Sequence, residues 1–124
     1  MQQKMSEIDE VKTQEFSLIH GELTPPHVFI LENGEIGLID IEGAKYFDIE
    51  YEWAIINLIY GNKIPLPKSI DNKKLEFYKL CLKVGDISVA TDYLMNVDGN
   101  DKWFRDLRES NMNDLKNMIS GSSP

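Results

Sequence analysis

The chain has 124 residues, 42% of them hydrophobic, and its 21 acidic and 13 basic side chains give a net charge of −8. This length and composition predict one globular domain over residues 1–124. The negative charge argues against binding to nucleic acids or to anionic membrane surfaces, because both require clustered Lys and Arg. The sequence has a single cysteine, no apolar run near the roughly 18 residues that span a bilayer, and no signal-peptide core, so a cytoplasmic location is expected.

The N-terminal part of the chain begins with a polar segment. Residues 1–14 are polar and mixed in charge, although apolar residues recur every third position and favour a short helix. Residues 15–19 are predicted to form a brief strand. A catalytic-loop and hairpin region is predicted over residues 15–47.

The clearest local pattern in this region predicts a β-hairpin. Residues 27–32 and 35–41 are rich in β-forming side chains and flank Asn33-Gly34, a dipeptide typical of a type I′ turn. Because apolar residues fill nearly every position of both strands, we expect both faces of the hairpin to be buried.

The remainder of the chain, residues 48–119, is predicted to be helical. Asp48 is a predicted N-cap, and the helix that follows is apolar all round, ends at Gly61 and is expected to be buried. Three further helices are predicted, over residues 71–84, 86–95 and 101–119, before a flexible tail at 120–124. The predicted fold class is therefore α+β and mostly helical, with a short hairpin and about four helices.

Titratable side chains gather around the predicted hairpin. His20 and His27, the two histidines of the chain, flank Glu22 on a Gly- and Pro-rich loop, and Asp40 and Glu42 follow the second strand. The loop before the first strand and the end of the second strand lie at one end of a hairpin, so we expect these side chains to converge. Such a set can bind a divalent metal or carry out acid–base chemistry, including metal-dependent hydrolysis. It is equally compatible with solvated loop acids beside a structural histidine.

The order of these residues resembles the aminoglycoside phosphotransferase family, small-molecule kinases with a protein-kinase-like fold. The stretch from His20 to Val28, HGELTPPHV, is similar to the family's catalytic loop, which reads His-Gly-Asp-Leu, three residues, Asn and then a strand. The stretch Ile39-Asp40-Ile41-Glu42 is similar to the family's metal-binding Asp segment. Asp48 and Glu52 match the two acidic positions that open the next helix. The resemblance covers about residues 16–61.

The resemblance implies a role for each matching residue. Glu22 falls at the catalytic base, which orients or deprotonates the acceptor hydroxyl. Asp40 and His27 fall at the two metal-binding positions, and Asp40 would bridge the metal to the phosphates of ATP. His20 and Asp48 would support the catalytic loop.

The function that the resemblance implies is transfer of the γ-phosphoryl group of ATP to a hydroxyl of a small molecule. The implied cofactors are ATP and a divalent metal, Mg²⁺ or Mn²⁺. Glu42, close to Asp40 in the sequence, is a candidate accessory acid. Glu22 stands where the family has Asp, and His27 stands where it has Asn. Because imidazole suits Mn²⁺ better than Mg²⁺, the second change favours Mn²⁺.

The resemblance is to the C-terminal catalytic lobe alone. The sequence has no Gly-rich phosphate loop and no predicted five-stranded sheet ahead of the catalytic loop. We therefore expect a chain that is inactive or incomplete alone and binds ATP poorly. It would either self-associate or pair with an N-terminal lobe. The alternative is a non-catalytic binding or scaffold domain derived from the same lobe.

Overall fold

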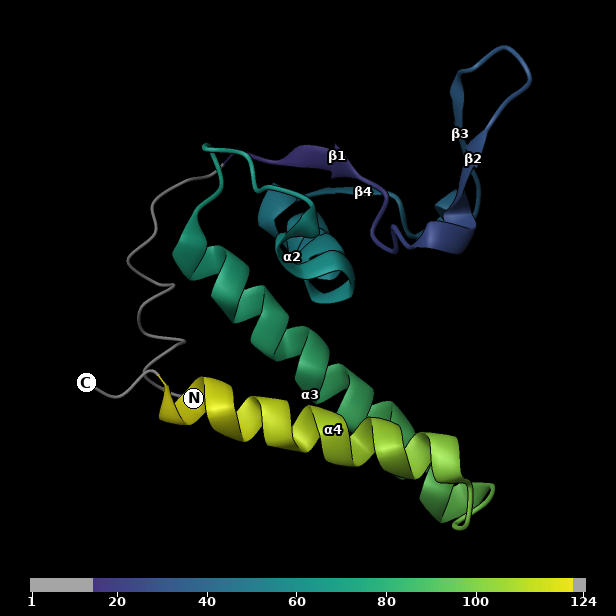
Figure 1. Cartoon of the computed structure of the whole chain (residues 1–124), viewed down its shortest axis with the longest axis vertical. Helices are drawn as coiled ribbons and strands as arrows, with labels where there is room; N and C mark the ends of the chain where they lie inside the picture. Colours follow the sequence, from purple (N-terminus) through teal and green to yellow (C-terminus); the bar gives the residue numbers. More distant parts are fainter. Residues whose placement is uncertain (1–14, 122–124) are drawn as a thin grey trace. The chain divides into compact units, whose positions relative to one another are not determined.

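The computed structural model describes residues 15–121, which hold four short strands and three α-helices (Figure 1). The fold is α+β and mostly helical, as predicted. Internal contacts divide the chain into two compact units, one ending at Lys79 and one beginning at Leu80, and each is described by itself. The polar segment 1–14 and residues 122–124 of the predicted tail lie outside the described residues. A single domain over residues 1–124 stays a prediction.

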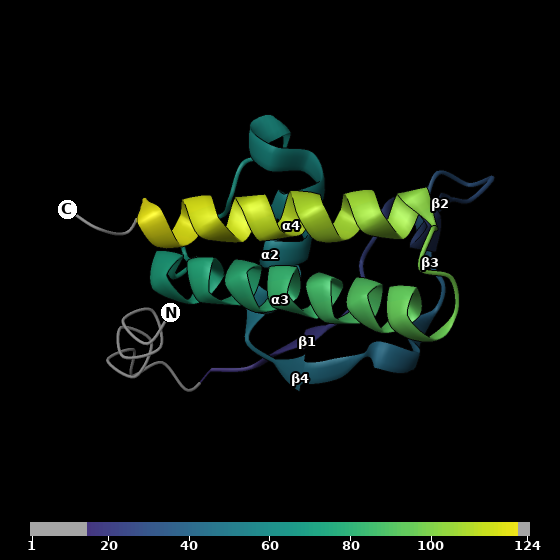
Figure 2. The same cartoon turned by 90° about the horizontal axis from the view of Figure 1, so that it is seen from below.

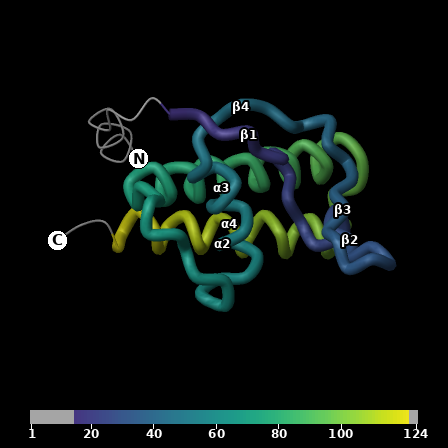
Figure 3. Tube along the Cα trace, turned by 90° about the horizontal axis from the view of Figure 1, so that it is seen from above, coloured from purple at the N-terminus to yellow at the C-terminus, as the bar shows by residue number. Residues whose placement is uncertain are grey.

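The first unit contains two small antiparallel sheets. Strand β1 (Ser17–Ile19) pairs with β4 (Lys45–Phe47), and β2 (Val28–Ile30) pairs with β3 (Ile36–Leu38) (Figure 3). The sequence predicted β1 and the β2–β3 hairpin, and both are confirmed. It did not predict β4, a strand that forms by pairing with β1, far away in the sequence.

The hairpin turn is not the predicted type I′ turn. Gly34 has a φ of +83°, but Asn33 does not share a positive φ, which a type I′ turn requires. The N–H of Gly34 donates to the Leu31 carbonyl at 2.8 Å, and the Leu31 N–H donates to the Glu35 carbonyl at 2.8 Å. These bonds define a three-residue loop, a type I turn followed by a left-handed glycine. The Asn33 side chain favours it by accepting the Glu35 N–H at 3.0 Å.

The hairpin strands are exposed, so the prediction that both of their faces are buried is wrong. Ile30 and Ile36 lie opposite each other and are 81% and 70% exposed. Phe29 and Leu38 are also exposed, and neither strand contains a buried residue. The apolar pattern thus marks a surface that no other element covers within residues 15–121.

Helix α2 (Ile49–Tyr60) begins and ends where the sequence predicted. Gly61 follows it with a φ of +58°, a backbone conformation that favours glycine. The helix is not buried all round, however. Its buried residues are Glu50, Glu52 and Ala54, whereas Ile59 is exposed. The carboxylates are buried because they accept hydrogen bonds from the backbone of neighbouring segments.

Helix α3 (Asn72–Asn96) is one continuous helix of 25 residues, where the sequence predicted two helices separated at Gly85. A glycine inside a helix costs only about 1 kcal/mol relative to alanine, which many flanking helical residues offset. The predicted count of about four helices therefore becomes three within the described residues. At the start of α3, the Asp71 carboxylate accepts the N–H groups of Lys73 and Lys74 at 2.8 and 3.2 Å.

The second unit is a helical hairpin, made of the α3 segment from Leu80 onward and of α4 (Lys102–Ser120) (Figure 2). Asp101 caps α4, because its side chain accepts the Phe104 N–H at 3.0 Å. The rings of Tyr93 and Phe104 stack with their centroids 3.8 Å apart. None of the helices in residues 15–121 combines the length and apolar character needed to cross a membrane.

Candidate functional site

His20 connects the loop after β1 to the segment after β3. Its side chain is buried, and Nε2 lies 2.8 Å from the Ile39 carbonyl oxygen. Because a carbonyl can only accept, Nε2 carries the proton, and Nδ1 accepts the Glu22 N–H at 3.2 Å. Both ring nitrogens are therefore used in holding the loop, which leaves neither for a metal or a substrate.

Gly21 brings the loop into direct backbone contact with the turn after β3. Gly21 has a φ of +89°, and a Cβ added to it would lie 2.6 Å from the Gly43 carbonyl oxygen. A Cβ at Gly43 would in turn lie 3.4 Å from the His20 oxygen and 3.8 Å from Cγ of Glu22. The predicted base, Glu22, thus lies beside the turn Ile41–Gly43, which directly follows Asp40.

The predicted loop-supporting role of Asp48 falls to Glu52 instead. The Glu52 carboxylate is buried and accepts the backbone N–H groups of His20 and, at 3.3 Å, Gly21. Glu52 stands one helical turn beyond Asp48, and its longer side chain reaches the loop. Its second oxygen, Oε1, is buried and has no hydrogen-bond partner among residues 15–121. The sequence did single out Glu52 as an acidic position of the helix, but nothing in it showed which of the two acids reaches the loop.

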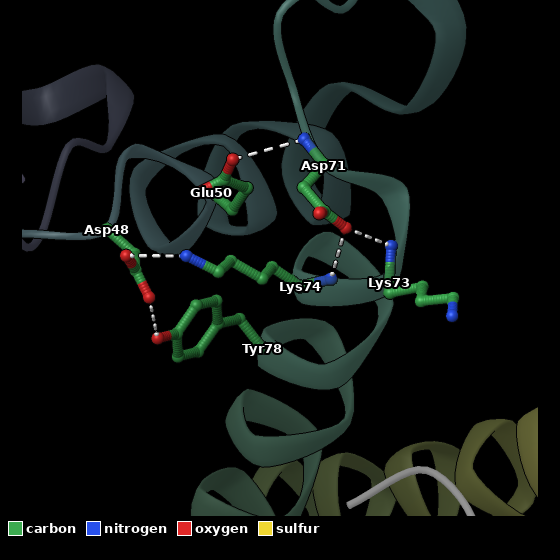
Figure 4. A network of polar contacts seen from close by, with 6 residues as sticks. All are labelled: Asp48, Glu50, Asp71, Lys73, Lys74 and Tyr78. Atoms are coloured by element: carbon green, nitrogen blue, oxygen red, sulfur yellow. Dashed lines mark hydrogen bonds and ion pairs between the residues drawn. The ribbon is translucent and has the colours of Figure 1, made fainter. Parts of the chain in front are cut away.

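Asp48 instead joins the start of α2 to the start of α3 (Figure 4). Its Oδ1 lies 3.0 Å from Lys74 Nζ, and its Oδ2 accepts the Tyr78 hydroxyl at 2.6 Å. Asp48 and Lys74 are 9% and 5% exposed, so this is a buried ion pair. Nearby, the Glu50 carboxylate accepts the Asp71 N–H at 3.1 Å. Asp48 also precedes α2 at the N-cap position, but its side chain makes no capping bond there.

Asp40 is held in an unusual backbone conformation. It is the one non-glycine residue in the described part of the chain with a positive φ, at φ 57° and ψ 50°. Such left-handed residues cost free energy and gather at functional sites. The Asp40 carboxylate is partly exposed, and its Oδ2 lies 3.2 Å from Nε2 of His27. The hairpin thus brings together two residues that are 13 positions apart in the sequence.

The hydrogen bonds of His27 direct Nε2 toward this carboxylate. Nδ1 lies 2.7 Å from the Glu22 carbonyl oxygen, so Nδ1 is the donor, and it also lies 3.2 Å from the Thr24 hydroxyl. In the neutral imidazole the lone pair is then on Nε2, and its 3.2 Å contact with the Asp40 carboxylate requires a shared cation. In the imidazolium, Nε2 instead donates to Asp40 as an ion pair. A histidine that binds a metal commonly donates its other N–H to a carbonyl in this way.

Asp40 and His27 fit the donor set of a metal site, with one carboxylate oxygen and one imidazole nitrogen facing each other. The predicted convergence of all the site residues is only partly realised. Glu22 and Glu42 are exposed, and within residues 15–121 no three His, Cys, Asp or Glu side chains are arranged to share a metal. A cation at the pair would take its other ligands from water or from phosphate oxygens, as Mg²⁺ commonly does.

An apolar pocket that the sequence analysis did not predict lies beside the loop. It has a volume of about 320 Å³ and is lined by Leu23, Thr24 and Val28 on one side and by Trp53, Ile56 and Tyr60 of α2 on the other. The last three recur at helical spacing on a helix that the sequence predicts to be buried. Instead they line a cavity, because the loop does not fill the space against the helix.

The comparisons with known proteins give a partial relative. The uncharacterized protein YcbJ of Bacillus subtilis strain 168 is 44% identical over 48 residues, which make up 38% of this chain and 16% of the relative. No protein family and no solved structure matches. The resemblance to the aminoglycoside phosphotransferases therefore rests on the residues of the loop and of the Asp40 segment.

Proposed function

We propose that this chain supplies the catalytic loop and the metal-binding residues of a phosphotransferase that moves the γ-phosphoryl group of ATP to a hydroxyl of a small molecule. The observation that carries the proposal is the backbone contact between Gly21 and Gly43. This contact sets Glu22 beside the segment that presents Asp40, and Nε2 of His27 lies 3.2 Å from Oδ2 of Asp40.

Each residue has a task in this proposal. Glu22 accepts the proton of the acceptor hydroxyl, or orients that hydroxyl, from its exposed position beside the turn. Asp40 and His27 would hold the cation, which when bound offsets the charge of the phosphates. His20 and Glu52 hold the loop that carries the base, through bonds to its backbone and to Ile39.

The part that holds the nucleotide lies outside the described residues in this proposal. The exposed apolar hairpin supports this arrangement, since Ile30 and Ile36 form a surface suited to a further packed element. The partial relative is also much longer than the matched segment, which spans 16% of it. Self-association of the isolated chain through the same hairpin surface stays a prediction.

Metal binding is expected to raise the melting temperature of the chain, and Mn²⁺ is expected to raise it more than Mg²⁺. Cation at about 100 times its Kd adds about 2.7 kcal/mol of stability, which is several degrees for a domain of this size. Differential scanning fluorimetry would measure the shift.

Asp40→Asn should abolish the metal-induced shift, because asparagine tolerates the left-handed backbone and removes the charge. Asp92→Asn, a matched change on exposed α3 surface, should leave it intact. An equal shift in both variants would contradict metal binding at Asp40.

Titration of the ¹⁵N-labelled chain with Mg-ATP tests the phosphotransferase proposal directly. We expect the amide signals of Glu22, Gly43 and Ala44 to move, with half-saturation above about 1 mM because the nucleotide-holding part is missing. Asp40→Asn should remove these shifts. Identical shifts in that variant, or none in the native chain, would favour the non-catalytic scaffold domain. Micromolar affinity that depends on Asp40 would show that the chain carries a whole nucleotide site, against the proposal of an incomplete one.

A further inference from the structure

We infer that the pocket between the catalytic loop and α2 binds the apolar part of a small uncharged alcohol, and that this alcohol is the phosphoryl acceptor. The role of the alcohol as acceptor rests on the proposed function, whereas the class of ligand rests on the pocket alone. The pocket favours an apolar alcohol over charged, polyhydroxylated acceptors such as the aminoglycosides.

The size and the lining of the pocket set the ligand class. Its volume of about 320 Å³ lies at the lower end of the range for small-molecule sites. The lining combines the aromatic rings of Trp53 and Tyr60 with aliphatic side chains, including Ile56 and Ile64, and contains no charged residue. A charged or heavily hydroxylated ligand would lose its hydration here and gain few partners, because the lining has few polar side-chain groups, such as the hydroxyls of Thr24 and Tyr60. An aromatic or aliphatic group would be stabilised by leaving water.

The position of the pocket links it to the proposed chemistry. Leu23 and Thr24 line the pocket and directly follow Glu22, the proposed base. The Thr24 hydroxyl lies 3.2 Å from Nδ1 of His27, whose Nε2 lies 3.2 Å from Asp40. The wall of the pocket is thus two polar contacts from the proposed metal carboxylate. Glu22 itself does not line the pocket. The inference therefore requires a ligand whose apolar end fills the pocket and whose hydroxyl extends past Leu23 to Glu22, the proposed base.

Tryptophan fluorescence provides a local readout of binding. The chain has two tryptophans, and Trp103→Phe leaves Trp53, in the lining of the pocket, as the single reporter. In this background the probe is 2-phenylethanol, a small uncharged alcohol with one ring. We expect saturable quenching or enhancement with a Kd of about 1 mM or tighter. Glycerol and kanamycin should produce no saturable change, because neither has an apolar group to bury.

A matched pair of substitutions tests the place of binding. Ile64 lines the pocket and Ile59 does not, yet both are partly exposed, at 36% and 44%. Ile64→Glu should weaken 2-phenylethanol binding about tenfold or more, because it brings a charge into the lining, and Ile59→Glu should change it less than about twofold. Equal weakening by both changes, or no saturable signal in the native background, would overturn the inference.

A second measurement separates the acceptor role from the phosphotransferase proposal. With 2-phenylethanol bound, NMR should show contacts from its ring to Ile56 and Tyr60 and from its hydroxyl-bearing carbon to Leu23. Binding in the reverse orientation would overturn the acceptor role. If Mg-ATP moves the Glu22 and Gly43 signals but 2-phenylethanol does not bind, this inference fails and the proposed function stands. If 2-phenylethanol binds in the expected orientation but Mg-ATP has no effect, the pocket's ligand class stands and the phosphotransferase assignment fails.

Discussion

Replacing Asp48 by alanine is expected to lower the free energy of unfolding of the first unit by about 3–5 kcal/mol. The Asp48 carboxylate bonds to Lys74 Nζ and to the Tyr78 hydroxyl, and both Asp48 and Lys74 are almost fully buried. In the variant the buried Lys74 ammonium keeps its desolvation cost but loses the compensation that Asp48 gives it. Urea unfolding, followed by Trp53 fluorescence in the Trp103→Phe background, would measure the loss.

Glu76→Ala is the control for this prediction. Glu76 also forms an ion pair with a lysine of α3, Lys79, at 3.2 Å, but its side chain is 44% exposed. Solvent screens such a pair, so we expect a change of less than about 1 kcal/mol. If the two substitutions destabilised the unit equally, burial of the Asp48–Lys74 pair would not make it more important for stability than an exposed pair.

Gly21→Ala is expected to destabilise the first unit by more than about 3 kcal/mol, through two independent effects. The positive φ of Gly21 already disfavours a side chain, and the new Cβ would lie 2.6 Å from the Gly43 carbonyl oxygen. Backbone must therefore move on one side of the contact. Because that contact places Glu22 beside the Asp40 segment, the variant should also lose the metal-induced rise in melting temperature.

Gly34→Ala separates the two effects. Gly34 has nearly the same φ, +83° against +89°, but a Cβ there would meet nothing within 4 Å. We expect this variant to lose only the conformational part, about 1 kcal/mol, and to keep its response to metal. Urea unfolding of both variants would measure the difference. Equal destabilisation would show that the Gly21–Gly43 contact can relax without cost.

The elements that the sequence predicted well carry strong local signals. The hairpin has a turn dipeptide between two β-rich runs, and α2 and α4 are each bounded by a capping residue or a glycine. The elements it missed lack such signals or are decided by distant packing. Strand β4 exists because it pairs with β1, 28 residues earlier, and Gly85 does not end α3 because helix on both sides holds it.

The candidate site likewise combines features that the sequence predicts with features that it does not. The order of the residues nominates Glu22, His27 and Asp40 as site residues, which stays a prediction. The structure shows that His27 contacts Asp40 and that Glu22 lies beside the turn after it. Sequence could not assign the loop-supporting role, because Asp48 and Glu52 differ in reach and not in local pattern. The sequence also could not show that the apolar hairpin is exposed. The same apolar residues would occur in strands that pack against their own unit and in strands that pack against another part of the protein.

The left-handed backbone of Asp40 has an evolutionary consequence. Few L-residues other than aspartate and asparagine adopt this conformation without a penalty, so most mutations at position 40 would disturb the fold as well as the charge. Either aspartate codon becomes an asparagine codon by one transition. A lineage that no longer needed the negative charge could therefore lose it by a single mutation and keep the fold. Asparagine at this position in a homologue would mark a domain that has lost the carboxylate and not the fold.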